Sequence, residues 1–485
     1  MFLGIDLGTS AVKVVLVDER QTIVGASEVQ LSPTQPQPGW WEDDPDSWLA
    51  AVDDAIDQLR AHHPAALAAV EAIGLSGQMH ASVLLGADDR PVRPAILWND
   101  GRAMAEADEL ARHSDALNRR LGVAAMASFT APKIVWLARH ERETLQKTRR
   151  LMLPKDYVRL HLSGAFATDV SDASGAWLLD VERRTWDAEA IALCGIDPAW
   201  LPPLLESPQA SGVLRPELAR RWGMRDGVVV AAGGGDVAVG GVSIGAVHPG
   251  QSFISLGTSA QFFTVAARHQ PDPTRAVHAF CHAVPDTWFQ MAALLNGASV
   301  LSAAARWTGG RDLGDMLAEV ESGYRGPSAL LALPYLSGER TPHNRPDLRG
   351  AIIGLDAATR PTDILQAMME SVAYSLADAH AVLGAKIGSA GLIGGGARSL
   401  LWAKMIASIT GVELVRYVAA ERGPAFGAAR LARLASRNEP VADVAVVPQV
   451  EQVIAPDDAL RDAYAPRLEA FRSLYAALAP EFARR

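Results

Sequence analysis

Apolar residues cluster at the start of the chain in a pattern that predicts two short strands joined by a tight turn. The pattern covers residues 3–17, and β-branched residues dominate its second half. The turn between the strands is formed by Gly8, Thr9 and Ser10, whereas Asn-Gly or Asp-Gly is typical of a short hairpin. Asp6 lies inside the first strand, and a buried carboxylate requires a partner or a metal ion.

This turn has the chemistry of a phosphate site. If it faces a ligand, its glycine lets backbone N–H groups come close and its hydroxyls donate hydrogen bonds. Lys13 on the second strand adds positive charge, and Asp6 is placed to hold a hydrated cation. The alternative for Asp6 is a carboxylate that is hydrogen-bonded to its own turn.

The same turn recurs far along the chain. Residues 253–263 repeat the order strand, Leu-Gly-Thr-Ser, strand, with Gly257 and Thr258 at the turn. Ser255 takes the place of Asp6, so the turn is duplicated and the carboxylate is not. A repeat of this length predicts two similar halves whose turns face each other across a cleft. A chance recurrence of four residues is the alternative.

Further patterns are typical of an α/β chain. Asp44 precedes a proline and predicts the start of a helix, and residues 362–385 predict a longer helix capped by Thr362. Residues 334–350 predict a long loop, in which residues 338–342 are expected to form a surface excursion.

A second candidate site follows the buried-strand pattern of residues 228–232. Three glycines and Asp236 come next, and they precede a helical pattern. Glycines allow a substrate to approach the backbone, and Asp236 could then accept a proton from an alcohol. A helix N-cap is the alternative role of Asp236, and the two roles can coexist. Residues 233–238 also fit a dinucleotide fingerprint, but they lie mid-chain and leave the repeated turns unexplained.

Other reaction classes find little support in the sequence. No lysine follows a glycine, which excludes a Walker-type nucleotide loop. His278, Cys281 and His282 are spaced like metal ligands but lack a fourth partner. A zinc site there therefore stays an alternative to an ordinary buried segment.

Length and charge narrow the class of protein. With 485 residues the chain exceeds a single core, and we expect two domains, residues 1–242 and 243–485. The net charge of −10 without a basic stripe argues against nucleic acid as a partner. Two cysteines are consistent with a reducing compartment, and no signal peptide or membrane-length apolar stretch is present. We therefore expect a cytoplasmic protein without a membrane partner.

Seven stretches taken together resemble one known family, the FGGY carbohydrate kinases. They are LGIDLGTSAVK at 3–13, GQMH at 77–80, WNDGR at 98–102, GGGD at 233–236, SLGTS at 255–259, YLSGERTPH at 335–343 and GGGAR at 394–398. The resemblance runs from end to end in order, and it is strongest to members that act on xylulose. It implies an α/β fold with two ribonuclease-H-like domains, of the actin and hexokinase type, with ATP and a sugar in the cleft between them.

The resemblance also implies roles for individual residues. Asp236 falls on the catalytic base, Met79 and His80 join it as sugar contacts, and Asp6 falls on the catalytic acid that is associated with Mg²⁺. The implied contacts to ATP are Gly8, Thr9, Ser10, Lys13, Gly257, Thr258, Gly297, Gly395 and Gly396.

The implied reaction is transfer of the γ-phosphoryl group of MgATP to a ketopentose, with D-xylulose as the expected substrate. Members that act on xylulose usually have Asn after the base, where this chain has Val237, so another ketose or a pentitol of the ribulose type is an alternative. Glycerol kinases carry Arg-Glu in place of Met79 and His80, which disfavours glycerol. An actin-like or heat-shock-type ATPase is the alternative from another class. A homodimer is compatible with the sequence, which leaves the oligomeric state open.

Overall fold

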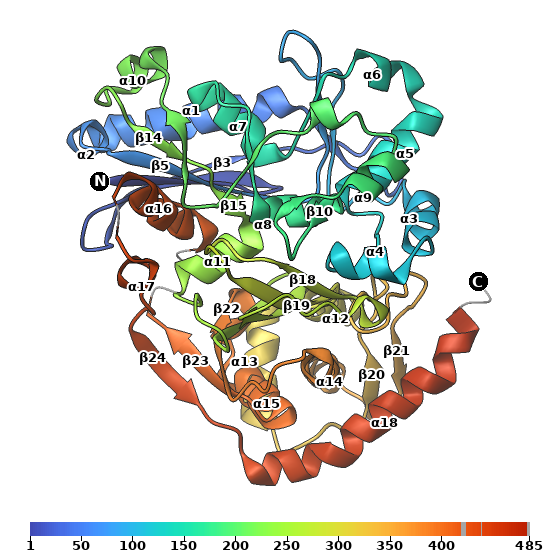
Figure 1. Cartoon of the computed structure of the whole chain (residues 1–485). Helices are drawn as coiled ribbons and strands as arrows, with labels where there is room; N and C mark the ends of the chain where they lie inside the picture. The colour runs from blue at the N-terminus through green and yellow to red at the C-terminus, as the bar shows by residue number, and fades with distance from the viewer. Residues whose placement is uncertain (419–422, 438, 483–485) are drawn as a thin grey trace.

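The computed structural model describes residues 1–418, 423–437 and 439–482, and it divides into two α/β halves that lie against each other (Figure 1). The first half is built on a sheet with the order β13-β14-β5-β1-β2-β3, in which β15 also pairs with β5. Its strands are β1 (Phe2–Leu7), β2 (Ala11–Val17), β3 (Ile23–Gln30), β5 (Ala72–Gly77), β13 (Ala210–Val213), β14 (Val229–Ala231) and β15 (Gly234–Gly235).

The second half is built on a sheet with the order β18-β19-β17-β16-β22-β23-β24. Its strands are β16 (Ser252–Leu256), β17 (Ala260–Ala266), β18 (Val277–Cys281), β19 (Trp288–Leu294), β22 (Ser389–Ile393), β23 (Glu413–Tyr417) and β24 (Val450–Ile454).

The two sheets share one topology, which confirms the predicted internal repeat and the expected fold class. β1 runs antiparallel to β2 and parallel to β5, and β16 runs antiparallel to β17 and parallel to β22. Each Gly-Thr-Ser turn joins the first two strands of its sheet. The recurrence of four residues is therefore not a coincidence.

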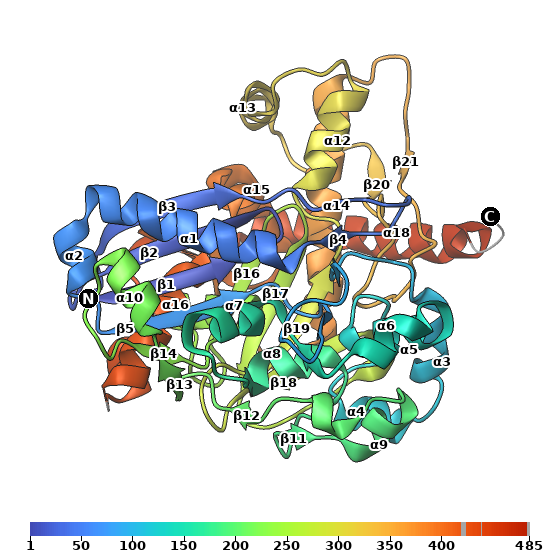
Figure 2. The ribbon, with the colours of Figure 1, turned by 90° about the horizontal axis from the view of Figure 1, so that it is seen from above.

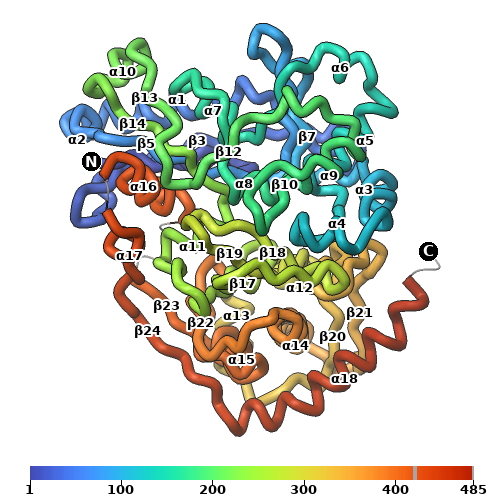
Figure 3. Tube along the Cα trace, in the orientation of Figure 1, coloured from blue at the N-terminus to red at the C-terminus, as the bar shows by residue number. Residues whose placement is uncertain are grey.

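Helices surround both sheets. In the first half they are α1 (Pro45–His62), α2 (Pro64–Ala68), α3 (Met104–Ala111), α4 (Asp115–Arg120), α5 (Thr130–His140), α6 (Arg142–Lys147), α7 (Pro154–Ser163), α8 (Val170–Ala173), α9 (Ala188–Leu193), α10 (Pro216–Trp222) and α11 (Asp236–Ser243). In the second half they are α12 (Ser299–Trp307), α13 (Leu313–Gly323), α14 (Pro361–Val382), α15 (Leu400–Thr410), α16 (Gly423–Ser436), α17 (Val441–Val444) and α18 (Asp458–Phe482). The long helix α18 runs along the outside of the second half (Figure 3).

The side chains of β1 alternate between two faces of the sheet. Leu3, Ile5 and Leu7 pack with α1, whereas Phe2 packs with α16 on the opposite face. Figures 1 and 2 show α1 and α16 on opposite sides of these strands. Because successive strand residues point to opposite faces, Asp6 lies on the same face as Phe2.

Helix α16 comes late in the sequence, yet it covers the sheet of the first half. A Cβ atom at Gly4 would lie 1.9 Å from the carbonyl oxygen of Ala425, and one at Gly74 would lie 1.8 Å from that of Ala428. The helix backbone therefore rests directly on β1 and β5. The domain boundary after residue 242 stays a prediction. Helix α16 lies after that boundary in the sequence but packs on the sheet that precedes it.

Two local expectations are wrong. Residues 338–342 are not a surface excursion, because Glu339 is 2% exposed and Thr341 is fully buried. Thr362 does not cap its helix, since α14 begins at Pro361 and its cap is Arg360. The backbone N–H of Arg360 donates to Asp363 Oδ2 at 2.9 Å, so the carboxylate in the first turn satisfies the cap residue that the Thr362 assignment missed.

The strand and helix around residues 233–236 exist, but they do not form a dinucleotide-binding unit. After α11 the chain leaves the first sheet, and its next strand, β16, belongs to the second sheet. No parallel βαβ unit therefore begins at this glycine run, as a dinucleotide fingerprint would require. Within the described residues, the helices are all too short or too polar to cross a membrane.

We predict that Gly74→Ala lowers the free energy of unfolding by at least about 2 kcal/mol, because the new methyl group overlaps the backbone of α16. Chemical denaturation followed by tryptophan fluorescence would measure the loss. Gly323→Ala is the matched control, since a Cβ there meets nothing within 4 Å. Equal stability of the two variants would contradict the close packing of α16 on β5.

Candidate functional site

Three parallel strand ends bring the candidate residues to one edge of the first sheet. Asp6 on β1 lies opposite Ser76 on β5, and Ser76 lies opposite Gly234 on β15. The residues that follow these strands therefore emerge side by side. They are the first Gly-Thr-Ser turn, the segment with Met79 and His80, and Asp236 at the start of α11.

The glycines before Asp236 are required by close packing. Gly233 has a φ of +76°, and a Cβ there would lie 2.5 Å from the carbonyl oxygen of Leu75. A Cβ at Gly235 would lie 2.8 Å from Sδ of Met79. A larger residue at either position would push Asp236 away from β5 and from the Met79 side chain.

Asp236 and Asp6 form a pair of interacting carboxylates. Burial, and after it the negative charge of Asp6, raises the pKa of Asp236 from 3.8 to about 7. The backbone N–H of Val237 donates to Asp236 Oδ1 at 2.8 Å and lowers that pKa slightly. Asp236 is the first residue of α11 and Gly235 is the cap, so the expected N-cap role is displaced by one residue. A carboxylate with this pKa can exchange protons near neutral pH.

Asp6 is 8% exposed, and burial raises its pKa to about 6, although Ser76 and Lys13 lower it. Its Oδ1 atom lacks a hydrogen-bond partner among the described residues. An unpartnered carboxylate oxygen beside the first turn is suited to a hydrated cation, because Mg²⁺ is usually held by one or two carboxylates together with water and phosphate oxygens. Oδ1 of Asp6 therefore makes no hydrogen bond to the described residues of the turn, contrary to the alternative role of this carboxylate.

His80 is held neutral and in one tautomer. Burial lowers its pKa to about 3, and its Nδ1 lies 2.7 Å from the carbonyl oxygen of Gly175. Because that carbonyl can only accept, Nδ1 must carry the proton, which leaves Nε2 as an acceptor. The ring lies 4.8 Å from that of Phe129, and Met79 beside it is 5% exposed.

Sequence reasoning missed two residues that hold His80. Lys133 Nζ donates to the carbonyl oxygens of His80 and Ser128 at 3.0 and 2.7 Å, and Thr130 Oγ1 donates to that of His80 at 2.9 Å. Burial lowers the pKa of Lys133 to about 7. A single lysine on an amphipathic helix gives no sequence signal, so only the fold reveals its contact with the backbone of residue 80.

The first turn is tied to the same segment. Thr9 Oγ1 donates to Gln78 Oε1 at 3.0 Å and accepts from Trp98 Nε1 at 2.8 Å. The Thr9 hydroxyl is thus engaged within the first half. Ser10 is exposed, whereas the partly exposed Gly8 donates its N–H to the carbonyl oxygen of Ala11 at 3.0 Å.

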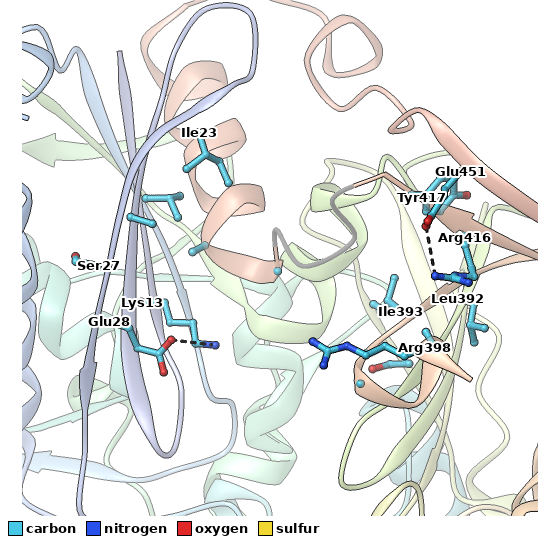
Figure 4. Close-up of a pocket in the computed structure, with 18 residues that line it drawn as sticks. Lys13, Ile23, Ser27, Glu28, Leu392, Ile393, Arg398, Arg416, Tyr417 and Glu451 are labelled. Atoms are coloured by element: carbon cyan, nitrogen blue, oxygen red, sulfur yellow. Dashed lines mark ion pairs between the residues drawn. The ribbon is translucent and has the colours of Figure 1, made fainter. Parts of the chain in front are cut away.

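A cleft of 1020 Å³ separates this turn region from the second half (Figure 4). Lys13 lines one wall and forms an ion pair with Glu28 at 3.6 Å. Ser255, Gly395 and Arg398 line the facing wall. The cleft therefore brings Lys13 and Gly395, two of the predicted nucleotide contacts, to opposite sides of one cavity.

Two other predicted nucleotide contacts, Gly297 and Gly396, lie at tightly packed positions in the second half. The backbone N–H of Gly297 donates to the carbonyl oxygen of Thr258 at 3.1 Å, and that of Ala298 donates to Gly257 at 2.8 Å. A Cβ at Gly297 would lie 2.4 Å from the backbone of Ser259, and one at Gly396 would lie 2.7 Å from the ring of Trp402. These two glycines are therefore positions of tight packing, and neither is among the residues that line the cleft.

The zinc alternative finds no support in the described residues, which contain no group of three or more His, Cys, Asp or Glu side chains that could hold a metal ion. Cys281 Sγ donates to the carbonyl oxygen of Val181, and His282 Nε2 lies 3.0 Å from that of Ala246. His278 is fully buried among aromatic rings. These three side chains belong to the core.

Comparison with known proteins agrees with this geometry. The models of the N-terminal and C-terminal domains of the FGGY family of carbohydrate kinases match residues 1–243 and 252–436. The xylulose kinase of Escherichia coli strain K12 is 42% identical over 485 residues, which is 99% of both chains. The xylulose kinase of Bacillus subtilis strain 168 is 34% identical and covers 90% of this chain and 88% of its own. A crystal structure of a "xyloylose kinase" from Brucella ovis superposes with a TM-score of 0.95 at 42% identity, over 99% of each chain.

We predict that Asp6→Asn lowers the pKa of Asp236 below about 7, because the substitution removes the neighbouring negative charge and leaves the burial in place. Carboxyl ¹³C NMR titration of the substrate-free protein would measure the shift. Asp18→Asn, at an exposed turn, is the control and should leave that pKa unchanged. An unaltered titration of Asp236 in the Asp6 variant would show that the two carboxylates do not interact.

Proposed function

The chain belongs to the FGGY family of carbohydrate kinases, and we propose that it transfers the γ-phosphoryl group of ATP to the terminal hydroxyl of D-xylulose, which gives D-xylulose 5-phosphate. The observation that carries the chemistry is the pair Asp236 and Asp6 at one sheet edge beside an interdomain cleft. Full-length relatives that are named xylulose kinases support the choice of sugar.

Asp236 is the proposed base. Phosphoryl transfer depends mainly on the positioning of the reactants and on charge stabilisation, so the base orients the attacking hydroxyl and accepts its proton late. A base works best when its pKa lies near the operating pH, and burial beside Asp6 brings Asp236 to that range. The glycines before it let the backbone that carries Asp236 pack directly against Leu75 and Met79.

His80 and Met79 are the proposed sugar contacts. The free Nε2 atom of the neutral His80 ring can accept a hydrogen bond from a sugar hydroxyl, and the Met79 side chain offers an apolar surface for the carbon chain. The fixed tautomer of His80 orients that acceptor before the sugar binds.

The two walls of the cleft are the proposed ATP site. Lys13 places a positive charge on the first wall, and Gly8 and the exposed Ser10 lie in the turn that precedes its strand. Gly395 lines the second wall, and Gly257 and Thr258 lie in the turn that follows Ser255 of that wall. Gly297 packs against this turn, and Gly396 is tightly packed beside Gly395.

Asp6 is the proposed Mg²⁺ residue, through water or directly. Its unpartnered Oδ1 and its position beside the first turn fit a cation that is held mostly by ATP. When bound with ATP, Mg²⁺ would supply positive charge to the phosphate oxygens. Lys13 lowers the pKa of Asp6 and so favours the ionised carboxylate that such a cation needs.

Val237 supports a second candidate substrate. Its apolar side chain follows the base, at the position where members of the family that act on xylulose usually carry Asn. A site that lacks one hydrogen-bonding group can change its preference between similar sugars by orders of magnitude. Another ketose or a pentitol of the ribulose type is therefore the second candidate.

An assay of ADP release tests the substrate. We expect the highest kcat/KM with D-xylulose, compared with L-xylulose, both ribulose enantiomers and the corresponding pentitols. A clearly higher value for a ribulose or a pentitol would replace D-xylulose by that sugar. ADP release that does not depend on any sugar would instead support the ATPase alternative.

We predict that Asp236→Asn lowers kcat by about 100-fold or more, because the general base is lost, while the affinity for ATP is retained. Kinetics of ADP release and calorimetric titration with a non-hydrolysable ATP analogue would measure the two effects. Asp18→Asn serves again as a control with unchanged turnover. Wild-type turnover in the Asp236 variant would remove this residue from the mechanism.

A further inference from the structure

A fully buried ionic network lies behind the glycine run that precedes Asp236. Lys155 Nζ contacts Asp156 Oδ1 at 2.6 Å, Asp169 Oδ1 at 2.9 Å and Asp172 Oδ2 at 3.1 Å. Arg159 joins through Asp156 at 2.8 Å. All five side chains are completely buried, and none of them has a role in the proposed reaction.

One branch of this network reaches the backbone beside the base. The backbone N–H of Gly235 donates to Ser171 Oγ at 3.1 Å, and Ser171 Oγ donates to Asp169 Oδ2 at 2.5 Å. Because the hydroxyl proton of Ser171 is committed to a carboxylate, its oxygen becomes a better acceptor for the Gly235 N–H. Lys155 holds the other oxygen of the same carboxylate.

Other contacts fix the beginning of the glycine run. The N–H of Gly233 donates to the carbonyl oxygen of Ser207 at 3.1 Å, and Arg159 Nη1 donates to that of Ala232 at 2.8 Å. Ser207 Oγ also donates to Asp169 Oδ2, at 2.7 Å. The side chain of Ser171 is thus the one that acts at Gly235, directly before the base, whereas Ser207 acts on Gly233 through its backbone.

The network also contacts the strand that precedes the proposed sugar residues. A Cβ at Gly77 would lie 3.0 Å from Cβ of Lys155, and Gly77 is paired with Gly235 across β5 and β15. A Cβ at Gly234 would lie 2.9 Å from Ser171 Oγ. Lys155 and Ser171 therefore pack against both segments whose separation sets the distance between the base and the sugar.

We propose that Ser171, oriented by Asp169, is a positioning residue that fixes the backbone of Gly235 and thereby the reach of Asp236 toward the sugar hydroxyl. This inference rests on the proposed role of Asp236 as the base. Ser171 does not touch the reactants, and its effect is on the geometry of phosphoryl transfer. A base displaced by about 1 Å can cost about 100-fold in rate.

The energetics of the network agree with a positioning role. Three aspartates face one lysine and one arginine, and burial raises the pKa of Asp172 well above its usual value, so the cluster can keep one proton and remain neutral. Buried ion pairs of this kind contribute little net stability compared with apolar packing. They do fix the orientation of the Ser171 hydroxyl through Asp169, which apolar side chains could not do.

The test compares Ser171→Ala with Ser207→Ala by measuring kcat, KM for sugar and ATP, and thermal stability. Both variants remove one buried hydroxyl that donates to Asp169 Oδ2, so we expect similar losses of stability. We expect Ser171→Ala to lower kcat about 10-fold to 100-fold with KM for ATP unchanged, and Ser207→Ala to retain kcat within about threefold. Ser171→Thr, which keeps the hydroxyl, should restore most of kcat.

Wild-type kcat in Ser171→Ala, or an equal loss in both alanine variants, would overturn the inference. Hydrogen exchange of the unmodified protein gives a test that does not depend on the folding of any variant. The Gly235 amide should exchange as slowly as the core strands, and fast exchange would also overturn the inference. The Asp236→Asn variant distinguishes failure of the proposed base from failure of the positioning role. Wild-type turnover in Asp236→Asn would rule out Asp236 as the base. An inactive Asp236→Asn together with a fully active Ser171→Ala would rule out only the positioning role of Ser171.

Discussion

The parallel register of β1, β5 and β15 is the constraint on which the candidate site depends. Parallel strands end at the same edge of a sheet, so residues that are 74 and 156 positions apart in sequence emerge as neighbours there. Asp6, His80 and Asp236 have no local reason to meet. Their proximity follows from which strands pair, and a shift of one residue in any of the three strands would point these side chains to the other face.

The same register explains the acid–base properties of the site. Asp6 at the end of β1 and Asp236 at the start of α11 both lose water, and each finds too little positive charge nearby to compensate. Burial thus raises both pKa values toward neutrality, where a base is useful. Lys13, on the neighbouring strand, favours the charged form of Asp6 and leaves Asp236 as the group with the higher pKa.

Much of this arrangement could be predicted from the sequence, since a turn that is specified by a few consecutive residues can be recognised without knowing the fold. The first hairpin, the repeated turn and the glycine run before Asp236 are of this kind. Residues 338–342 were mistaken for a surface loop, because Gly, Glu, Arg and Pro are typical of exposed turns. In the fold, Glu339 accepts from the backbone N–H of Leu295, and Thr341 Oγ1 donates to the carbonyl oxygen of Ala276, and these contacts with distant segments bury the loop. Lys133 and Ser171 were missed for a similar reason, because their partners are backbone atoms of other segments.

The two halves have similar folds but different residues at their turns. This difference gives the protein one candidate site rather than two. The first turn has Asp6 beside it and the second has Ser255, so only one of the two repeated turns has a carboxylate next to it. Helix α16 comes from the second half of the chain, but it packs on Gly4 and Gly74 in the first sheet. The second half therefore covers one face of the sheet that carries Asp6. The distance between α16 and β1 cannot change without loss of this backbone contact. Any closure of the cleft would therefore have to leave α16 in place on β1 and β5, at the sheet that carries Asp6.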